Sequence, residues 1–195
     1  MPYATPDELR RLLREESWTP EETATAELLI ELGQGVIEDE IGQPLEQSTD
    51  VVILDGPTAD DSRYQAGTGS RKLILPRWPV TSVTSVTLTD DGEELVFGKD
   101  ADYTWSAAGI LHRRGAEWPC HDRAIEVIYT PGYLPVPAGP KRICLRLAAA
   151  AGWSNPESLS SETLGDHARA WSAEALGMAL TPADIRTLGA YRART

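Results

Sequence analysis

The sequence predicts an α+β fold, in which an α-helical bundle of three to four helices has a small antiparallel β domain inserted into it. Apolar residues recur at helical spacing near both ends of the chain, whereas from about residue 51 to 133 they alternate with a period of two. The helical segments at the two ends need each other to bury their apolar faces. We therefore expect residues 1–46 and 135–195 to form one helical bundle and residues 47–134 to form the inserted β domain.

Three helix starts share one signature, in which a threonine is followed by a proline and, three residues after the threonine, by an acidic residue. The three starts are Thr5-Pro6, Thr19-Pro20 and Thr181-Pro182. The threonine oxygen can accept a hydrogen bond from an otherwise unpaired amide, proline has no amide to leave unpaired there, and the acid complements the helix dipole. These signals predict helices over residues 6–15, 20–41 and 181–194.

The second of these helices has an apolar stripe and a strongly acidic polar face. The stripe consists of Ala24, Leu28, Leu32, Val36, Ile37 and Ile41. Gly42 and Pro44 end the helix. Residues 1–50 include 13 acidic and 3 basic residues, and most of these acids lie on the polar faces of the first two helices. Such a face can be simply solvated or can have a function, and both interpretations stay open.

Seven segments in the middle of the chain predict short strands. They are residues 51–54, 72–75, 80–89, 94–97, 102–105, 109–113 and 124–130. Turn signals such as Asp90-Asp91-Gly92 and Pro131-Gly132 separate them. We expect a small β domain with five to seven strands.

The chain then returns to a helical pattern. Residues 135–140 predict a stiff, proline-containing linker. Residues 141–151 predict a third helix with an alanine-rich face, which Gly152 ends. Residues 154–177 are polar and rich in turn formers, and the sequence assigns no element to them.

Composition excludes several classes of protein. The 195 residues include 30 acidic and 18 basic ones, for a formal net charge of −12, whereas proteins that bind nucleic acid in bulk have a basic footprint. No apolar run is long enough for a transmembrane helix and the N-terminus lacks signal-peptide features, so we expect a soluble protein without a membrane partner. The two cysteines, Cys120 and Cys144, are too few for a disulfide scaffold or a four-thiolate zinc site.

Signals for catalysis are sparse. The cluster Cys120-His121-Asp122 could supply a nucleophile or half of a metal site, but no second ligand pair has zinc-like spacing. Residues 67–72 (Gly-Thr-Gly-Ser-Arg-Lys) hint at an anion-binding loop, but they precede a strand, so helix N-terminal amides are not available to them. No common phosphate-loop or hydrolase motif is present. We expect no enzyme, no cofactor and no metal, with a Cys/His hydrolase as the less favoured alternative.

Tryptophan is over-represented among the aromatic residues, with six tryptophans against one phenylalanine. Trp78, Trp105 and Trp118 could form a platform, which would make the chain a carbohydrate- or protein-binding β module on a helical base. Because tryptophan buries a large area and is enriched at protein contacts, a role in the core or in an interface is favoured over the platform.

A succession of short motifs extends over nearly the whole chain. The motifs are residues 3–9 (YATPDEL), 37–45 (IEDEIGQPL), 75–83 (LPRWPVTSV), 102–105 (DYTW), 109–111 (GIL), 127–133 (VIYTPGY), 136–137 (VP) and 161–166 (SETLGD). In this order the chain resembles the head–tail connector (head-to-tail adaptor) proteins of tailed bacteriophages. That family has a Pro-X-X-Pro-Val turn leading into a strand, and a Ser-Glu-X-(Leu/Ile)-Gly-Asp stretch after the third helix of the bundle.

The resemblance implies a structural virion protein rather than an enzyme. Such adaptors assemble into a twelve-fold ring beneath the portal, extend the DNA channel and join the capsid to the tail. The implied partners are the portal protein, the next neck protein (a stopper or head-completion protein) and further copies of this chain, while packaged DNA passes without specific binding. The implied location is the neck of a virion, after synthesis in the cytoplasm of a host bacterium.

Two surfaces are candidates for these roles. The last helix and its basic end form a short amphipathic element that could dock on the portal, although ordinary packing on the bundle explains the same pattern. Its residues are Ile185, Leu188, Tyr191, Arg192 and Arg194. An acidic helix face along the DNA channel would repel the phosphates of passing DNA. The acids nominated for that face are Glu27, Glu31 and Glu38.

Overall fold

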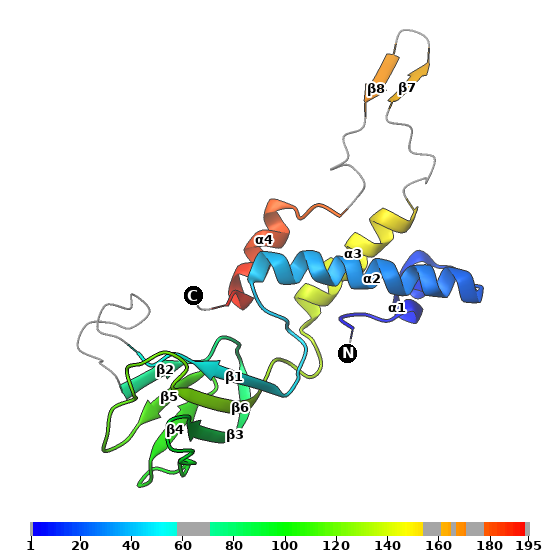
Figure 1. The fold of residues 1–195 in the computed structure, drawn as a ribbon. Helices are drawn as coiled ribbons and strands as arrows, with labels where there is room; N and C mark the ends of the chain where they lie inside the picture. The colour runs from blue at the N-terminus through cyan, green and yellow to red at the C-terminus, as the bar shows by residue number, and fades with distance from the viewer. Residues whose placement is uncertain (1, 58–70, 154–160, 165–166, 171–177, 194–195) are drawn as a thin grey trace. The chain divides into compact units, whose positions relative to one another are not determined.

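The computed structural model describes residues 2–57, 71–153, 161–164, 167–170 and 178–193. The fold is α+β, as the sequence predicts, with helices near both ends of the chain and antiparallel sheets between them (Figure 1). The chain divides into two compact units, which are considered separately. The helical unit comprises Met1–Gly42 and Val136–Arg192, and the β unit comprises Gln43–Pro135 and Ala193–Thr195.

Within the described residues, four α-helices form the helical unit. They are α1 (Pro6–Leu13), α2 (Pro20–Ile41), α3 (Ala138–Trp153) and α4 (Pro182–Leu188), and the 3₁₀ turn η3 (Gly189–Tyr191) follows α4. At the starts of α1, α2 and α4, the cap threonine and the acid three residues later bond to each other's backbone amides in a capping box. The three predicted helix starts are therefore confirmed. Gly42, with a φ of 72°, ends α2 in the left-handed conformation that glycine adopts readily.

Several helix ends differ from the sequence-based prediction. Helix α3 begins at Ala138, inside the predicted linker, because Pro140 lies in the first turn, where its missing amide removes no helical hydrogen bond. The same helix continues past Gly152 to Trp153. The last helix is shorter than predicted, since α4 and η3 together end at Tyr191.

Helix α2 packs against α3 through a stripe of small and branched residues. The stripe consists of Ala26, Ile30, Gly33, Ile37 and Ile41. Gly33 allows a close approach, because a Cβ there would lie 3.3 Å from the Cys144 carbonyl oxygen and 3.5 Å from Leu147 Cβ. The Cys144 thiol donates a hydrogen bond to the Ile30 carbonyl oxygen at 3.4 Å, and burial raises the pKa of this thiol to about 12.

This buried stripe is not the one that the sequence predicted. Ile37 and Ile41 are buried as expected, but Ala24, Leu28 and Leu32 are exposed. At about 100° per residue, Leu28 and Leu32 lie on the far side of the helix from the buried stripe. Both sets recur at helical spacing, so periodicity alone could not choose between them. The small residues Ala26 and Gly33 in the buried set allow α3 to pack closely against that side of α2. The side with Leu28 and Leu32 therefore faces away from α3 and is exposed.

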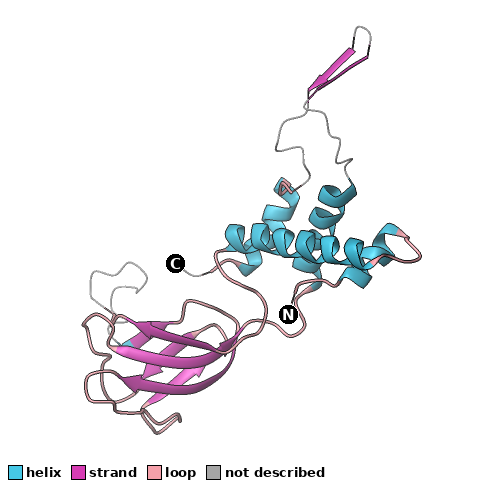
Figure 2. Cartoon of the chain, turned by 45° about the vertical axis from the view of Figure 1, so that its right-hand side comes forward, coloured by secondary structure: helices cyan, strands magenta, loops and turns pink. Residues whose placement is uncertain are grey.

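In the described part of the β unit, six strands form two antiparallel three-stranded sheets (Figure 2). One sheet has the order β1 (Asp50–Leu54), β6 (Ile125–Pro131) and β3 (Val80–Leu88), and the other has the order β2 (Lys72–Ile74), β5 (Ile110–Arg113) and β4 (Tyr103–Ser106). Both sheets contribute to one apolar core. Its buried residues are Leu73, Leu75, Val80, Val86, Leu95, Tyr103, Leu111, Trp118, Ala124, Ile125, Val127 and Tyr129.

The predicted strand over residues 94–97 is wrong. This segment makes only single bridges, from Glu94 to Thr87 and from Phe97 to Tyr103. The amide of Val96 donates to the Asp102 carboxylate at 2.8 Å, so a side chain takes the place of a ladder partner. The other six predicted strands are present, and each of their ends lies within one residue of the predicted position.

Arg77 fastens the segment that enters the β unit. Its Nη1 atom donates to Asp50 Oδ2 at 2.8 Å and to Ser48 Oγ at 2.7 Å. Its Nη2 atom donates to the carbonyl oxygens of Pro44 and Glu46 at 2.9 and 2.8 Å. The arginine side chain is 13% exposed, so these bonds are largely shielded from water. They hold the segment before β1 to the turn between β2 and β3.

A further antiparallel pair, β7 (Ser161–Leu164) and β8 (His167–Ala170), lies in the stretch to which the sequence assigned no element. Ser161 is opposite Ala170 in this pair. The described helices include none that is long and apolar enough to cross a lipid bilayer.

Candidate interaction surfaces

Three acidic residues of α2 lie along one side of the helix. Glu27, Glu31 and Glu38 are separated by four and seven residues, which keeps them on one face of a helix with about 3.6 residues per turn. Glu27 and Glu31 are exposed, whereas Glu38 is half-buried and accepts a hydrogen bond from Gln34 Nε2 at 2.8 Å. The three nominated acids thus form one acidic stripe, in which Glu38 is partly engaged within the protein.

Two exposed leucines lie on α2 beside the acidic stripe. Leu28 is 55% exposed and Leu32 is 51% exposed, and both lie on the side of α2 away from α3. By helical geometry this leucine strip lies roughly a quarter turn from the acidic stripe. Full burial of a leucine side chain stabilises a protein by about 2 kcal/mol. A partner that covers the leucine strip would therefore bind with a favourable hydrophobic contribution.

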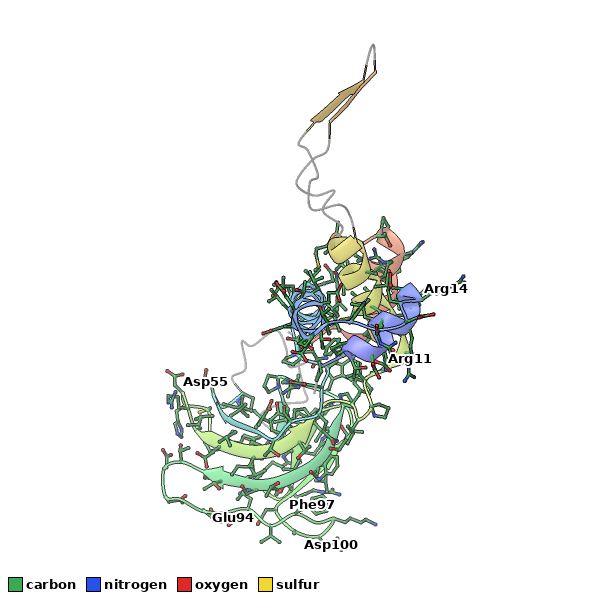
Figure 3. All side chains as sticks on the ribbon, turned by 90° about the vertical axis from the view of Figure 1, so that its right-hand side faces the viewer. Arg11, Arg14, Asp55, Glu94, Phe97 and Asp100 are labelled. Atoms are coloured by element: carbon green, nitrogen blue, oxygen red, sulfur yellow. The ribbon has the colours of Figure 1, made fainter. Side chains whose placement is uncertain are left out.

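Helix α1 provides a separate surface of the helical unit. In Figure 3, α2 is seen nearly end on, and Arg11 and Arg14 of α1 point away from it. The Arg11 side chain is 73% exposed and lies 3.6 Å from the Asp7 carboxylate. Arg14 ends α1 in the left-handed conformation, with a φ of 62°. The helical unit therefore has two distinct outer faces, the leucine strip on α2 and the Arg11/Arg14 side of α1.

The residues nominated for docking on the portal do not share one exposed face. Leu188 is fully buried in the helical unit, Tyr191 is half-buried, and Ile185 is 38% exposed. Helix α4 is held in place by Arg146 of α3, whose Nη2 atom donates to Asp184 Oδ2 at 2.7 Å. Leu188 is therefore part of the bundle core and not a surface anchor, which corrects its assignment from the sequence.

The basic end of the docking element is also partly engaged. Arg192 donates to the carboxylate of Glu40 on α2, so this arginine fastens the end of η3 to the helical unit. Its side chain is still 54% exposed. Arg194 lies outside the described residues.

In the cluster Cys120-His121-Asp122, the structure pairs the histidine with an aspartate from outside the cluster. His121 Nε2 lies 3.1 Å from Asp90 Oδ1, and Cys120 is exposed. Among the described residues, no group of three or more His, Cys, Asp or Glu side chains is placed to hold a metal ion.

The three tryptophans of the platform alternative do not form one surface. Trp118 is 2% exposed in the core of the β unit, and Trp105 packs against that core with its ring 6.4 Å from the Phe97 ring. Trp78 is half-buried, and its amide donates to Gln43 Oε1 at 3.0 Å. The burial of Trp118 in particular agrees with a core role.

The β unit has a basic pocket that the sequence patterns did not predict. The cavity measures about 310 Å³ and is lined by Arg71, Lys72, Thr104, His112, Arg113 and Arg114. Strand pairing assembles it, because His112 on β5 is opposite Lys72 on β2 and opposite Thr104 on β4. The possible anion-binding loop at residues 67–72 includes two of the lining residues, Arg71 and Lys72. The strand register, which brings the other residues to them, has no signature in the sequence.

Comparison with known proteins finds the same fold in solved structures of gene transfer agent particles. No protein-family model matches the chain, and no curated protein does. A chain in the structure of the virion of a native gene transfer agent particle matches with a TM-score of 0.57 at 17% identity, covering 97% of this chain and 89% of that one. A chain in the neck of an empty gene transfer agent particle, computed with C6 symmetry, matches with a TM-score of 0.55 at 19% identity and the same coverage. The chain therefore shares its fold with these proteins over nearly its whole length.

Proposed function

We propose that this chain is a structural neck protein of a phage-like particle, a head-to-tail adaptor that joins the capsid to the tail. The observation that carries the proposal is the fold shared over 97% of the chain with a chain from the neck of a gene transfer agent particle. The succession of sequence motifs supports it, since it resembles that of head–tail connector proteins. In this role the protein is made in the host cytoplasm, belongs to the virion and catalyses no reaction.

The adaptor forms a ring of twelve copies beneath the portal and offers a platform to the next neck protein. In a closed ring of identical copies larger than a dimer, each contact joins two different surfaces of the subunit. The leucine strip on α2 and the Arg11/Arg14 side of α1 are two such surfaces. Covering the two leucines on a neighbouring copy removes apolar area from water, so we assign the leucine strip to the contact between subunits.

The acidic stripe of α2 suits the wall of a DNA channel. Since it lies roughly a quarter turn from the leucine strip, one helix can contact a neighbouring subunit and face the channel. Its carboxylates repel DNA phosphates and keep the duplex from adhering during passage. Rings with Glu27→Lys and Glu31→Lys should retain duplex DNA at low salt and release it at high salt. If these rings retain no more DNA than unchanged rings, the stripe does not line the channel.

The segment α4–η3 is the proposed portal-docking element. Ile185, Tyr191 and Arg192 are its accessible residues, whereas Leu188 anchors α4 in the bundle. Because Arg192 already pairs with Glu40, docking through this arginine exchanges a contact within the helical unit for one with the portal.

Electron microscopy of a reconstituted complex tests the adaptor role. When the purified protein is mixed with portal rings from its own particle, negative-stain images should show an additional ring on one end of the portal. The double variant Cys120→Ala with His121→Ala should add the same ring, because an adaptor needs no catalytic cluster. Portal rings that stay bare over the whole range of protein concentrations would exclude the adaptor role.

A further inference from the structure

The basic pocket concentrates positive charge in an acidic protein. Four of the eight basic residues between residues 51 and 135 line it, although the whole chain has a net charge of −12. In the part of the chain that the structure describes, none of these four forms an ion pair with a carboxylate. The four positive charges repel one another, so an anion bound between them would lower the electrostatic energy of the pocket.

The pocket has a positive electrostatic environment at its centre. The pKa of His112 is lowered by burial and, in addition, by the positive charges of Lys72 and Arg114. His112 lies in one cross-strand row between Lys72 and Thr104, so the row combines an ammonium, an imidazole and a hydroxyl group. These three side chains are half-buried, which limits screening by water.

A buried tryptophan holds two arginines at the pocket. The Arg113 guanidinium lies over the Trp118 ring, with its Cζ atom 5.6 Å from the ring centroid. The Trp118 indole N–H donates to the Arg71 carbonyl oxygen at 3.1 Å. Trp118 is 2% exposed and belongs to the core, so core packing fixes the position of the ring that both arginines contact.

Arg113 has donors without acceptors. Its Nε and Nη1 atoms are buried and have no hydrogen-bond partner among the described residues. Buried polar groups in folded proteins are normally paired, so these two atoms are exceptions, and they lie where the guanidinium covers the Trp118 ring. A planar guanidinium presents its donors in a fork that matches the oxygens of a phosphate or carboxylate group.

We propose that the basic pocket binds a phosphate group, which either free phosphate or a nucleic-acid backbone can supply. Phosphate is favoured over carboxylate because the lining residues are mostly donors, and phosphate has more acceptor oxygens than the two of a carboxylate. The site lies in the β unit and none of its residues belongs to the surfaces assigned to the adaptor role. The two proposals therefore stand or fall separately.

Calorimetric titration of the full-length protein with inorganic phosphate at low ionic strength tests the site. The double variant Lys72→Gln with Arg114→Gln should bind phosphate roughly tenfold more weakly, the loss expected when a charge-assisted hydrogen bond is removed. Lys99→Gln, which removes one charge from an exposed position of the same unit, is the control and should change the affinity by less than about twofold. Thermal unfolding checks that each variant is folded. If the double variant does not fold, Arg114→Gln alone, at an exposed position, must show the weaker binding.

Two further titrations separate the possible sources and ligands. Duplex DNA that binds, is displaced by phosphate and is lost in the double variant identifies the nucleic-acid backbone as the source. Phosphate binding that duplex DNA does not compete with identifies free phosphate. The proposal is overturned if phosphate does not bind, if acetate binds as tightly as phosphate, or if Lys99→Gln weakens binding as much as the double variant.

Discussion

Ion pairs between single side chains join the helices of the helical unit. Lys141 of α3 donates to Glu8 of α1, and Arg146 of α3 donates to Asp184 of α4. The hydrogen bond from Lys141 lowers the pKa of Glu8 against the opposing effect of burial, and bonds with Thr5 lower it further. A carboxyl group whose pKa is lower in the folded state stabilises the fold only while it is ionised.

Glu8→Gln should therefore reduce the loss of stability at acid pH. Because the folded-state pKa of Glu8 lies below its ordinary value of 4.5, its contribution is complete above that value and is lost as the pH falls through the folded-state pKa. Urea unfolding at neutral pH and about one pH unit below 4.5 measures the effect. The unchanged protein should lose more stability between these conditions than the variant.

The exposed Glu27 of α2 provides the matched control for this measurement. Glu27→Gln should follow the unchanged protein, since this carboxylate is exposed and pairs with no side chain in the described parts of the chain. If Glu8→Gln loses as much stability on acidification as the unchanged protein, the contact between Glu8 and Lys141 does not contribute to folding.

Within the element α2, two glycines have contrasting surroundings. Gly33 faces α3 closely, whereas a Cβ at Gly35 would have nothing within 4 Å. Glycine in a helix interior is about 1 kcal/mol less favourable than alanine, so both positions lower the intrinsic stability of the helix. Only at Gly33 does the missing side chain serve the packing of α2 on α3.

Substitutions at these two glycines should have opposite effects. Gly35→Ala should stabilise the protein by about 0.5–1 kcal/mol, because it raises helix propensity without a clash. Gly33→Leu should destabilise it by about 2 kcal/mol, because the added side chain must displace α3. Chemical denaturation compares the free energies of unfolding. A Gly33→Leu variant as stable as the unchanged protein would show that α2 and α3 do not approach as closely as described.

At the scale of the whole molecule, charge and apolar surface are distributed unevenly. The first 50 residues hold 13 of the 30 acids and only 3 basic residues, whereas the basic pocket gathers four cations on the β unit. The leucine strip is apolar surface directly beside the acidic stripe. These surfaces differ enough to serve separate contacts in an assembly.

Leu28→Gln with Leu32→Gln should abolish the ring on the portal without unfolding the subunit. Since both leucines are about half exposed, we expect the stability of the monomer to change by less than about 1 kcal/mol. Leu134→Gln is the matched control, because Leu134 is 67% exposed in the β unit, outside the proposed contact. Negative-stain microscopy of portal mixtures reports the ring. Normal rings from the double variant would mean that the leucine strip does not join subunits.

The sequence by itself determined the features that depend on neighbouring residues. The Thr-Pro helix starts require only a side chain and an amide three residues away, and all three are present in the structure. Period-two alternation and turn residues likewise placed six of the seven predicted strands, and with them the α+β class. Such patterns can be recognised without knowing the fold, because the hydrogen bonds and steric limits behind them involve residues close together in the sequence.

The tertiary structure decided which residues meet. On α2 two sets of apolar residues had helical spacing, and the approach of α3 at Gly33 buried one set and left Leu28 and Leu32 exposed. Leu188 belongs to a helix whose amphipathic pattern suggested a docking surface, but the packing of α4 in the helical unit buries this residue in the core. The register of β2, β5 and β4 brought Lys72, Thr104 and His112 into one row. These outcomes depend on contacts between segments far apart in the chain, where packing overrides periodicity.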